Sequence, residues 1–210
     1  MTSSLAALGP TYLPLWDACE PGVPAPGKPP SPLAAEIADS VALVISYQGR
    51  YQALEATTGV PWWFMGVLHL MESSCDFRTH LYNGDPLTAR TVNVPAGRPV
   101  AGEPPFTWEA SATDAFESHG WLLDSVHRLP DGQPDWTLPT VLWRLEAWNG
   151  FGYRLHGVRT PYLWAASILE QPGRYVADGS WDANAWSKQV GAAVVLKEMV
   201  TRGLVSVAGA

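Results

Sequence analysis

The chain has 210 residues, of which 47% are hydrophobic and 16% are charged, and its formal net charge is -7 at pH 7. This length and composition fit one globular domain with a sizeable core, and the chain is short for two full domains. The acidic balance and the absence of a basic block argue against nucleic acid as a partner and against electrostatic docking onto an anionic membrane or wall polymer.

The N-terminal part of the chain is rich in proline. The run from Gly22 to Pro32 reads GVPAPGKPPSP, a composition typical of an extended linker or a wrapped arm. We therefore predict that residues 1–32 form an irregular arm and that residues 33–210 form a single domain.

The first helices are expected directly after this arm. Residues 33–57 have helical apolar spacing with one weak point at Gly49. Pro61 suits the first position of the next helix. That helix, PWWFMGVLHLMESS, is apolar on nearly every side, which predicts a central and buried position.

The segment 76–106 changes character, since it combines proline, glycine and short β-prone pieces with a tight-turn signal at Asn83-Gly84. We predict a small β-hairpin followed by a proline-rich loop. The later part is expected to be helical, with Asp182 capping a last helix that ends near residue 202. The other expected helices span 109–128, 138–148 and 161–169. This order predicts a predominantly helical α+β fold.

The N-terminal sequence MTSSLAALGP lacks the basic region and apolar run of a secretory signal. No stretch approaches the roughly 20 apolar residues of a membrane span. We expect synthesis in the cytoplasm, no membrane insertion, and action outside only after lysis of a host or non-classical export. The sequence leaves the export route and the oligomeric state open, with a monomer favoured.

Cys19 and Cys75 are the two cysteines of the chain, too few for a disulfide scaffold and without CxxC spacing for zinc. A single bridge and two free thiols are both compatible with the sequence, and free thiols are favoured. The histidines show no HExxH or other metal-binding spacing. We therefore expect neither a metal nor another cofactor.

Glu72 is the strongest candidate for a catalytic residue, because it ends the most apolar helix expected in the chain. Glycoside hydrolysis needs a carboxylic acid that stays protonated near neutral pH and protonates the leaving oxygen. An apolar setting raises the pKa of a carboxyl group, since it disfavours the charged form. A glutamate turned to solvent at the end of a helix is the structural alternative.

A second group would be needed to hold a water opposite that acid in an inverting glycosidase. Asp85 stands beside the Asn83-Gly84 turn, and Thr91 falls on the predicted second strand. A carboxylate and a hydroxyl on facing strands can bind one water. The structural alternatives are an ordinary turn aspartate before Pro86 and an ordinary strand threonine.

The segment LHLMESSCDFRTHLYNGDPL resembles the lysozyme-like superfamily of phage endolysins, goose-type lysozymes and lytic transglycosylases. In these proteins a catalytic glutamate ends a buried helix, is often followed by serine, and faces a β-hairpin across the sugar cleft. Glu72-Ser73 matches that pair, and the spacing of Asp85 and Thr91 resembles that of phage-type enzymes. The later WNGFGY resembles a Tyr-Asn-x-Gly cleft element, with Trp148 replacing tyrosine and Gly150 directly following the asparagine.

The resemblance implies a lysozyme-like catalytic domain that hydrolyses the β-1,4 bond between N-acetylmuramic acid and N-acetylglucosamine in peptidoglycan. Glu72 would be the acid, and Asp85 with Thr91 would position the water. Eleven tryptophans suit stacking on sugar rings. The residues expected to hold the glycan strand are Tyr82, Asn83, Trp148, Asn149 and Tyr153. The alternatives are a lytic transglycosylase that uses Glu72 alone, a chitinase, and a glycan-binding protein without catalysis.

Overall fold

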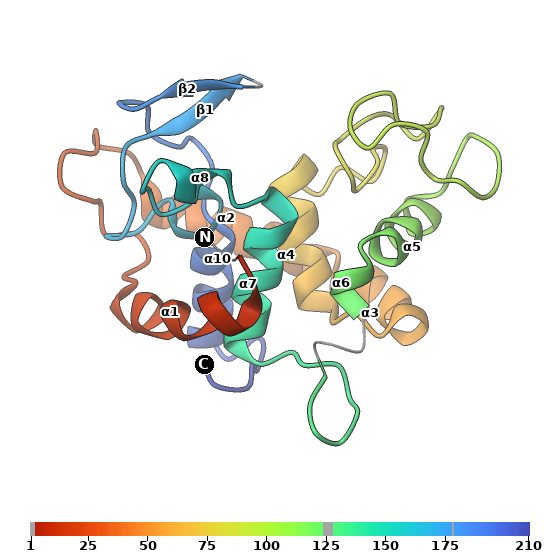
Figure 1. Ribbon diagram of the computed structural model, residues 1–210, viewed down its shortest axis with the longest axis horizontal. Coiled ribbons are helices and arrows are strands. Elements are labelled where there is room, and N and C mark those ends of the chain that lie inside the picture. Colours follow the sequence, from red (N-terminus) through yellow and green to blue (C-terminus); the bar gives the residue numbers. More distant parts are fainter. Residues whose placement is uncertain (1–2, 124–127, 178) are drawn as a thin grey trace. The chain divides into compact units, whose positions relative to one another are not determined.

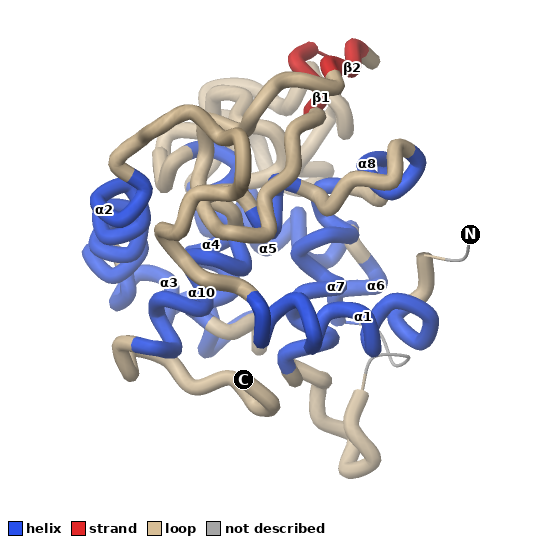
Figure 2. Tube along the Cα trace, turned by 90° about the vertical axis from the view of Figure 1, so that its left-hand side faces the viewer, coloured by secondary structure: helices blue, strands red, loops and turns tan. Residues whose placement is uncertain are grey.

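The computed structural model describes residues 3–123, 128–177 and 179–210. Helices dominate these residues, and one antiparallel hairpin supplies their named strands, which confirms a predominantly helical α+β class (Figures 1 and 2). In chain order, the elements are α1 (Leu5–Ala18), α2 (Leu33–Ser46), α3 (Gln48–Thr58), α4 (Trp62–Ser73), α5 (Trp108–Ser118), α6 (Gly120–Leu123), α7 (Leu138–Asn149), α8 (Gly152–Leu155), α9 (Pro161–Trp164), β1 (Arg174–Ala177), β2 (Ser180–Asp182) and α10 (Ala192–Thr201).

The chain divides into two compact units. The first unit comprises residues 1–42 and 136–210, and the second comprises residues 43–135. The N-terminal segment belongs to the first unit because α1 packs against α7, as Figure 1 also shows.

The prediction of an irregular segment 1–32 is wrong for Leu5–Ala18, which forms α1 even though Pro10 and Pro14 lie inside it. Proline in a helix interior removes a backbone hydrogen bond and disfavours the helix. Here Ser4 caps the N-terminus, and Tyr12 and Trp16 are buried. Tertiary packing of these aromatic side chains therefore overrides the local preference.

The core of the first unit forms around α7, α9 and α10, where α9 packs against both α7 and α10. The close approach of α10 to α9 requires glycine at position 191. A Cβ there would lie 2.3 Å from the carbonyl oxygen of Leu163, which is closer than side-chain carbons occur. Gly191 is also the residue at which α10 begins, since it is the N-cap of that helix.

The C-terminal helix therefore starts later than the sequence predicted. Asp182 does not cap it but ends strand β2, which pairs with β1 in an antiparallel register of Arg174 with Asp182 and Tyr175 with Trp181. The prediction that Asp182 caps the last helix is wrong, because the residue pairs with Arg174 in the β1–β2 sheet. The predicted helix 161–169 ends earlier, at Trp164, and Ala166 has a positive φ of 65°.

The second unit is built from α3, α4 and α5. Helix α4 confirms the buried apolar helix expected after Pro61, because the residues from Trp63 to Met71 are all buried. Gly66 permits close packing inside this unit, since a Cβ there would lie 2.6 Å from a methyl carbon of Val44. The predicted helix 109–128 is observed as α5 and α6, and its residues 124–127 lie outside the described part of the chain.

The predicted β-hairpin within 76–106 is absent, since this fully described segment carries only an isolated antiparallel bridge between Thr79 and Pro86. The segment is a long loop between α4 and α5, drawn in tan in Figure 2. Its prolines lack the N–H that a continuous ladder needs. Side-chain hydrogen bonds shape this loop instead, as described below.

Both cysteines are free and buried, Cys19 in the first unit and Cys75 in the second, which confirms the favoured prediction of free thiols. None of the helices in the described residues is long and apolar enough to cross a membrane.

Candidate active site

Glu72 lies in the last turn of α4 and is half-buried. The helix ends just beyond it because Ser74 adopts a left-handed conformation, with φ 53° and ψ 39°. The backbone N–H of Ser74 donates to the carbonyl of Leu70, and that of Cys75 donates to the carbonyl of His69. These bonds satisfy two carbonyls in the last turns of the helix, so Glu72 is held on a well-defined helix end.

The Asn83-Gly84-Asp85 turn lies against this helix end. Gly84 has φ +78°, and a Cβ built on it would lie 3.7 Å from the carbonyl oxygen of Glu72. The amide oxygen of Asn83 accepts a hydrogen bond from the backbone N–H of Asp85 at 3.0 Å, the local turn that asparagine favours. The structure thus brings the backbone of Glu72 together with the predicted turn, although no hairpin strands flank that turn.

The carboxylate of Asp85 closes the loop. One oxygen accepts hydrogen bonds from the backbone N–H groups of Val92 at 2.8 Å and Asn93 at 2.9 Å, and the other accepts from the side-chain amide of Asn93 at 2.6 Å. These bonds, led by that from the Asn93 backbone, hold the pKa of Asp85 below its usual range, although burial opposes the shift. Asp85 is therefore an ionised carboxylate.

Thr91 is buried and does not lie on a strand, contrary to the prediction. Its hydroxyl donates to the carbonyl of Pro95 and accepts a bond from the backbone N–H of Arg98 at 2.9 Å. The backbones of Thr91 and Arg98 pair at 2.8 Å. The structure therefore places Thr91 in a tight turn, next in sequence to the two residues that the carboxylate of Asp85 holds.

Tyr82 anchors the loop to α5 and presents little of its ring to solvent, with a relative exposure of 6%. Its hydroxyl donates to the carboxylate of Asp114 at 2.7 Å and lies 2.8 Å from the hydroxyl of Ser118. Burial is the main reason that the pKa of Tyr82 is raised. Asp114 also pairs with Arg98 at 3.4 Å, so one carboxylate of α5 fixes two points of the loop.

Trp148, Asn149 and Tyr153 lie in the first unit, at the end of α7 and in α8. Trp148 is half-buried and Asn149 is exposed. Tyr153 belongs to an aromatic cluster, where its ring contacts those of Tyr175 at 5.4 Å and Trp181 at 5.7 Å.

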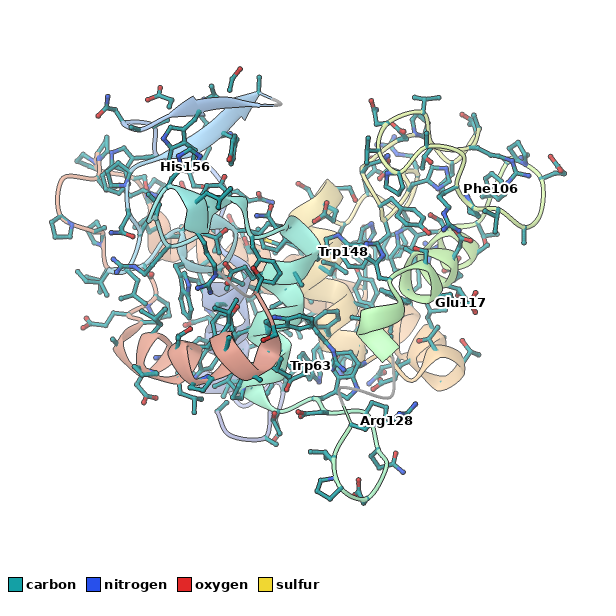
Figure 3. The ribbon with its side chains drawn as sticks, viewed as in Figure 1. Trp63, Phe106, Glu117, Arg128, Trp148 and His156 are labelled. Atoms are coloured by element: carbon teal, nitrogen blue, oxygen red, sulfur yellow. The ribbon has the colours of Figure 1, made fainter. Side chains whose placement is uncertain are left out.

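The imidazole of the exposed His156 completes this aromatic cluster. It stacks on Trp181 with ring centroids 3.7 Å apart, and its Nε2 lies 3.0 Å from the hydroxyl of Tyr175. Figure 3 shows His156 next to the β1–β2 hairpin. Gly173 permits this packing, since a Cβ there would lie 2.7 Å from the ring of Trp181.

Sequence reasoning did not find His80 and Asn93, two further residues that hold the loop in place. The side chain of His80 is fully buried, with its ring nitrogens 2.8 Å from the hydroxyl of Ser111 and 2.8 Å from the carbonyl of Ala89. Asn93, which binds Asp85, was equally unexpected. The only signal was indirect, because a long loop rich in glycine and proline needs polar side chains to satisfy its backbone.

Comparisons with known proteins give no relationship: no protein-family model matches the chain, and neither a curated protein nor a solved structure matches it. In the part of the chain that the structure describes, no group of three or more His, Cys, Asp or Glu side chains could hold a metal ion.

Proposed function

We propose that this protein cleaves the β-1,4 bond between N-acetylmuramic acid and N-acetylglucosamine in peptidoglycan, with Glu72 as the general acid. The observation that carries the proposal is the position of Glu72, half-buried at the end of the apolar helix α4, with the Asn83-Gly84-Asp85 turn against its backbone. A carboxyl group held on a rigid helix end supports this proposal, because acid catalysis at a glycosidic oxygen requires a positioned proton donor.

In this reaction the carboxyl group of Glu72 donates its proton to the glycosidic oxygen while the bond from that oxygen to the muramic C1 breaks. A water molecule attacks C1 and gives up a proton to a carboxylate on the other side of the sugar. We assign that role to Asp85, which is ionised, with Thr91 shaping the neighbouring turn. Each oxygen of a carboxylate can accept two hydrogen bonds, and the oxygen bonded to the Asn93 side chain accepts one from the protein.

Each unit presents its own candidate residues for contact with a glycan. In the second unit, Asn83 is half-exposed on the turn, and Tyr82 holds the loop in place from inside. In the first unit, Trp148 and Asn149 are at least partly exposed, and Tyr153 belongs to the aromatic cluster described above. Aromatic rings stack on the apolar faces of sugars, which suits an acidic protein that cannot rely on net charge.

A lytic transglycosylase is the second candidate, and one observation favours it. The carboxylate of Asp85 and the hydroxyl of Thr91 are both used by hydrogen bonds within the loop. A transglycosylase would use Glu72 first as acid and then as base, with the muramic 6-hydroxyl attacking in place of water. Asp85 would then only maintain the loop.

Mass spectrometry of the muropeptides released from purified peptidoglycan tests the proposal and separates these candidates. A hydrolase yields reducing-end muramic acid, and Asp85→Asn should abolish that product. Anhydromuramic products that persist in Asp85→Asn would identify the transglycosylase. The absence of any cleaved glycan with the unaltered protein would overturn both candidates, and chitin cleavage or glycan binding would then be measured.

A further inference from the structure

A pocket of about 420 Å³ lies within the first unit, and none of the residues assigned a catalytic role above lines it. It is lined by residues of α1, the end of α7 and the segment from Phe151 to Trp164. Most of its wall is apolar, formed by Leu8, Leu15, Phe151, Leu155, Val158 and Trp164. This size and composition fit a small organic ligand with an apolar body.

Charged residues form the polar part of this pocket. The carboxylate of Glu146 is 2% exposed, and both of its oxygens accept bonds from the guanidinium of Arg154 at 2.6 Å. The hydroxyl of Tyr12 donates to the same carboxylate at 2.7 Å. Glu146 is therefore neutralised by its neighbours, and its pairing uses the Nε and Nη2 atoms of Arg154 but not Nη1.

Arg159 supplies a second guanidinium to the same wall. Its Nε donates to the carbonyl of Leu169 at 2.8 Å. Among the residues that the structure describes, neither terminal nitrogen of Arg159 hydrogen-bonds to an acceptor and no carboxylate pairs with it. Burial lowers the pKa of this guanidinium because water is partly removed around it. The side chain nevertheless stays protonated, as arginine does in proteins.

The pocket wall thus contains two guanidinium groups and one carboxylate, an excess of positive charge in a chain whose net charge is -7. A cation would be repelled, and an uncharged apolar ligand would leave the terminal nitrogens of the half-buried Arg159 guanidinium without an acceptor, which is unfavourable. A carboxylate matches the planar donor fork of a guanidinium. Only an anionic ligand with an apolar body satisfies both parts of the wall.

We propose that this pocket binds a medium-chain aliphatic carboxylate, with its head on the guanidinium of Arg159 and its chain against the leucine, valine and aromatic side chains. This site is independent of the proposed glycosidase reaction, so loss of either activity leaves the other intact.

Isothermal titration calorimetry with decanoate, below its micelle concentration, tests the proposal on the full chain. We expect one molecule of decanoate to bind. Decan-1-ol and acetate should bind about 10- to 100-fold more weakly, because decan-1-ol lacks the carboxylate and acetate lacks the long apolar chain. Arg159→Met should weaken decanoate binding by about the same factor while leaving decanol binding unchanged. Arg202→Met is the matched control, because Arg202 pairs with Glu198 on the surface and does not line the pocket.

A second variant guards against a folding defect in Arg159→Met. Thr11 is exposed on α1 at the pocket wall, so Thr11→Glu places a negative charge there without disturbing the core. It should also weaken decanoate binding about tenfold or more. The proposal is overturned if the unaltered protein does not bind decanoate, if decanoate and decanol bind equally, or if both folded variants keep full affinity.

Discussion

The first unit and the long loop of the second unit bury carboxylates in different ways. In the first unit, Glu146 pairs with Arg154, and Glu170 pairs with Lys28, whose side chain is only 7% exposed. In the loop, the carboxylate of Asp85 has no cation within ion-pair distance among the described residues and is held by the N–H groups of Val92 and Asn93. The same chemical group joins distant segments in one region and shapes a single loop in the other.

The two arrangements predict different effects on stability when the carboxylate is lost. Removing one member of a buried ion pair leaves the opposite charge unpaired in a low-dielectric interior. This is among the changes that lower the free energy of unfolding most. Loss of the Asp85 carboxylate leaves only neutral N–H donors without an acceptor, and a loop can turn such donors toward water. The first unit should therefore be sensitive to loss of a single charge, and the loop should respond with a local change of shape.

The largest effect is expected for Glu170→Gln. This change leaves the ammonium of Lys28 buried without its partner and should lower the free energy of unfolding by about 3–5 kcal/mol. Urea unfolding followed by circular dichroism measures it. A loss below about 1 kcal/mol would show that water screens this ion pair. The first unit would then not be more sensitive to loss of a charge than the loop.

Acid should destabilise the second unit through His69, which is fully buried and lies 3.0 Å from the hydroxyl of Tyr51. Burial lowers the pKa of His69 from 6.5 to about 4. The unfolded chain therefore binds the extra proton between these two values, so stability falls as the pH drops from 6.5 to about 4 and levels off below. The expected loss is about 3 kcal/mol.

Urea unfolding at a series of pH values, compared between the unaltered protein and His69→Phe, isolates this contribution. The variant should lack the added loss between pH 6.5 and 4. Equal pH profiles for the two proteins would contradict the role of the buried imidazole.

Asp85→Asn should cost about 2 kcal/mol, since it replaces charge-assisted bonds to N–H groups with weaker or broken ones. Hydrogen exchange should accelerate at Val92, Asn93 and Arg98 and stay unchanged in the first unit. The depressed pKa of Asp85 means that its contribution is present above the ordinary aspartate pKa and is lost as the pH falls through the lower folded value. Unaltered exchange across the loop would show that Asp85 does not hold it.

The smallest effect is expected for Glu109→Ala, which breaks the exposed pair with Arg50. Both side chains are close to 40% exposed, at 42% for Arg50 and 38% for Glu109, so solvent screens the interaction. The expected cost is under about 1 kcal/mol. A cost equal to that of Glu170→Gln would mean that burial does not separate the two kinds of pair.

The sequence predicted the elements whose side chains repeat with helical spacing. Helix α4 and helix α7 fall where their apolar patterns place them. The prediction was wrong where long-range contacts determine the conformation. Helix α1 forms despite two internal prolines because its aromatic residues are buried. Asp182 lies in a strand because its segment pairs with β1.

The candidate site divides in the same way. The end of α4 near Glu72 and the turn at Asn83-Gly84 could both be predicted from the sequence, because each depends on local interactions. The bonds from Asp85 to Val92 and Asn93 were not, since nothing in a sequence pattern indicates which loop amide a carboxylate will reach.

The most direct test of the central proposal compares the release of soluble glycan from purified peptidoglycan by the unaltered protein, Glu72→Gln and Glu117→Gln. Glu117 is an exposed acid on α5 of the same unit and serves as the matched control. We predict that Glu72→Gln lowers the rate by about 100-fold or more at unchanged stability, as loss of a general acid does, and that Glu117→Gln keeps full activity. Undiminished glycan release by folded Glu72→Gln would contradict this prediction.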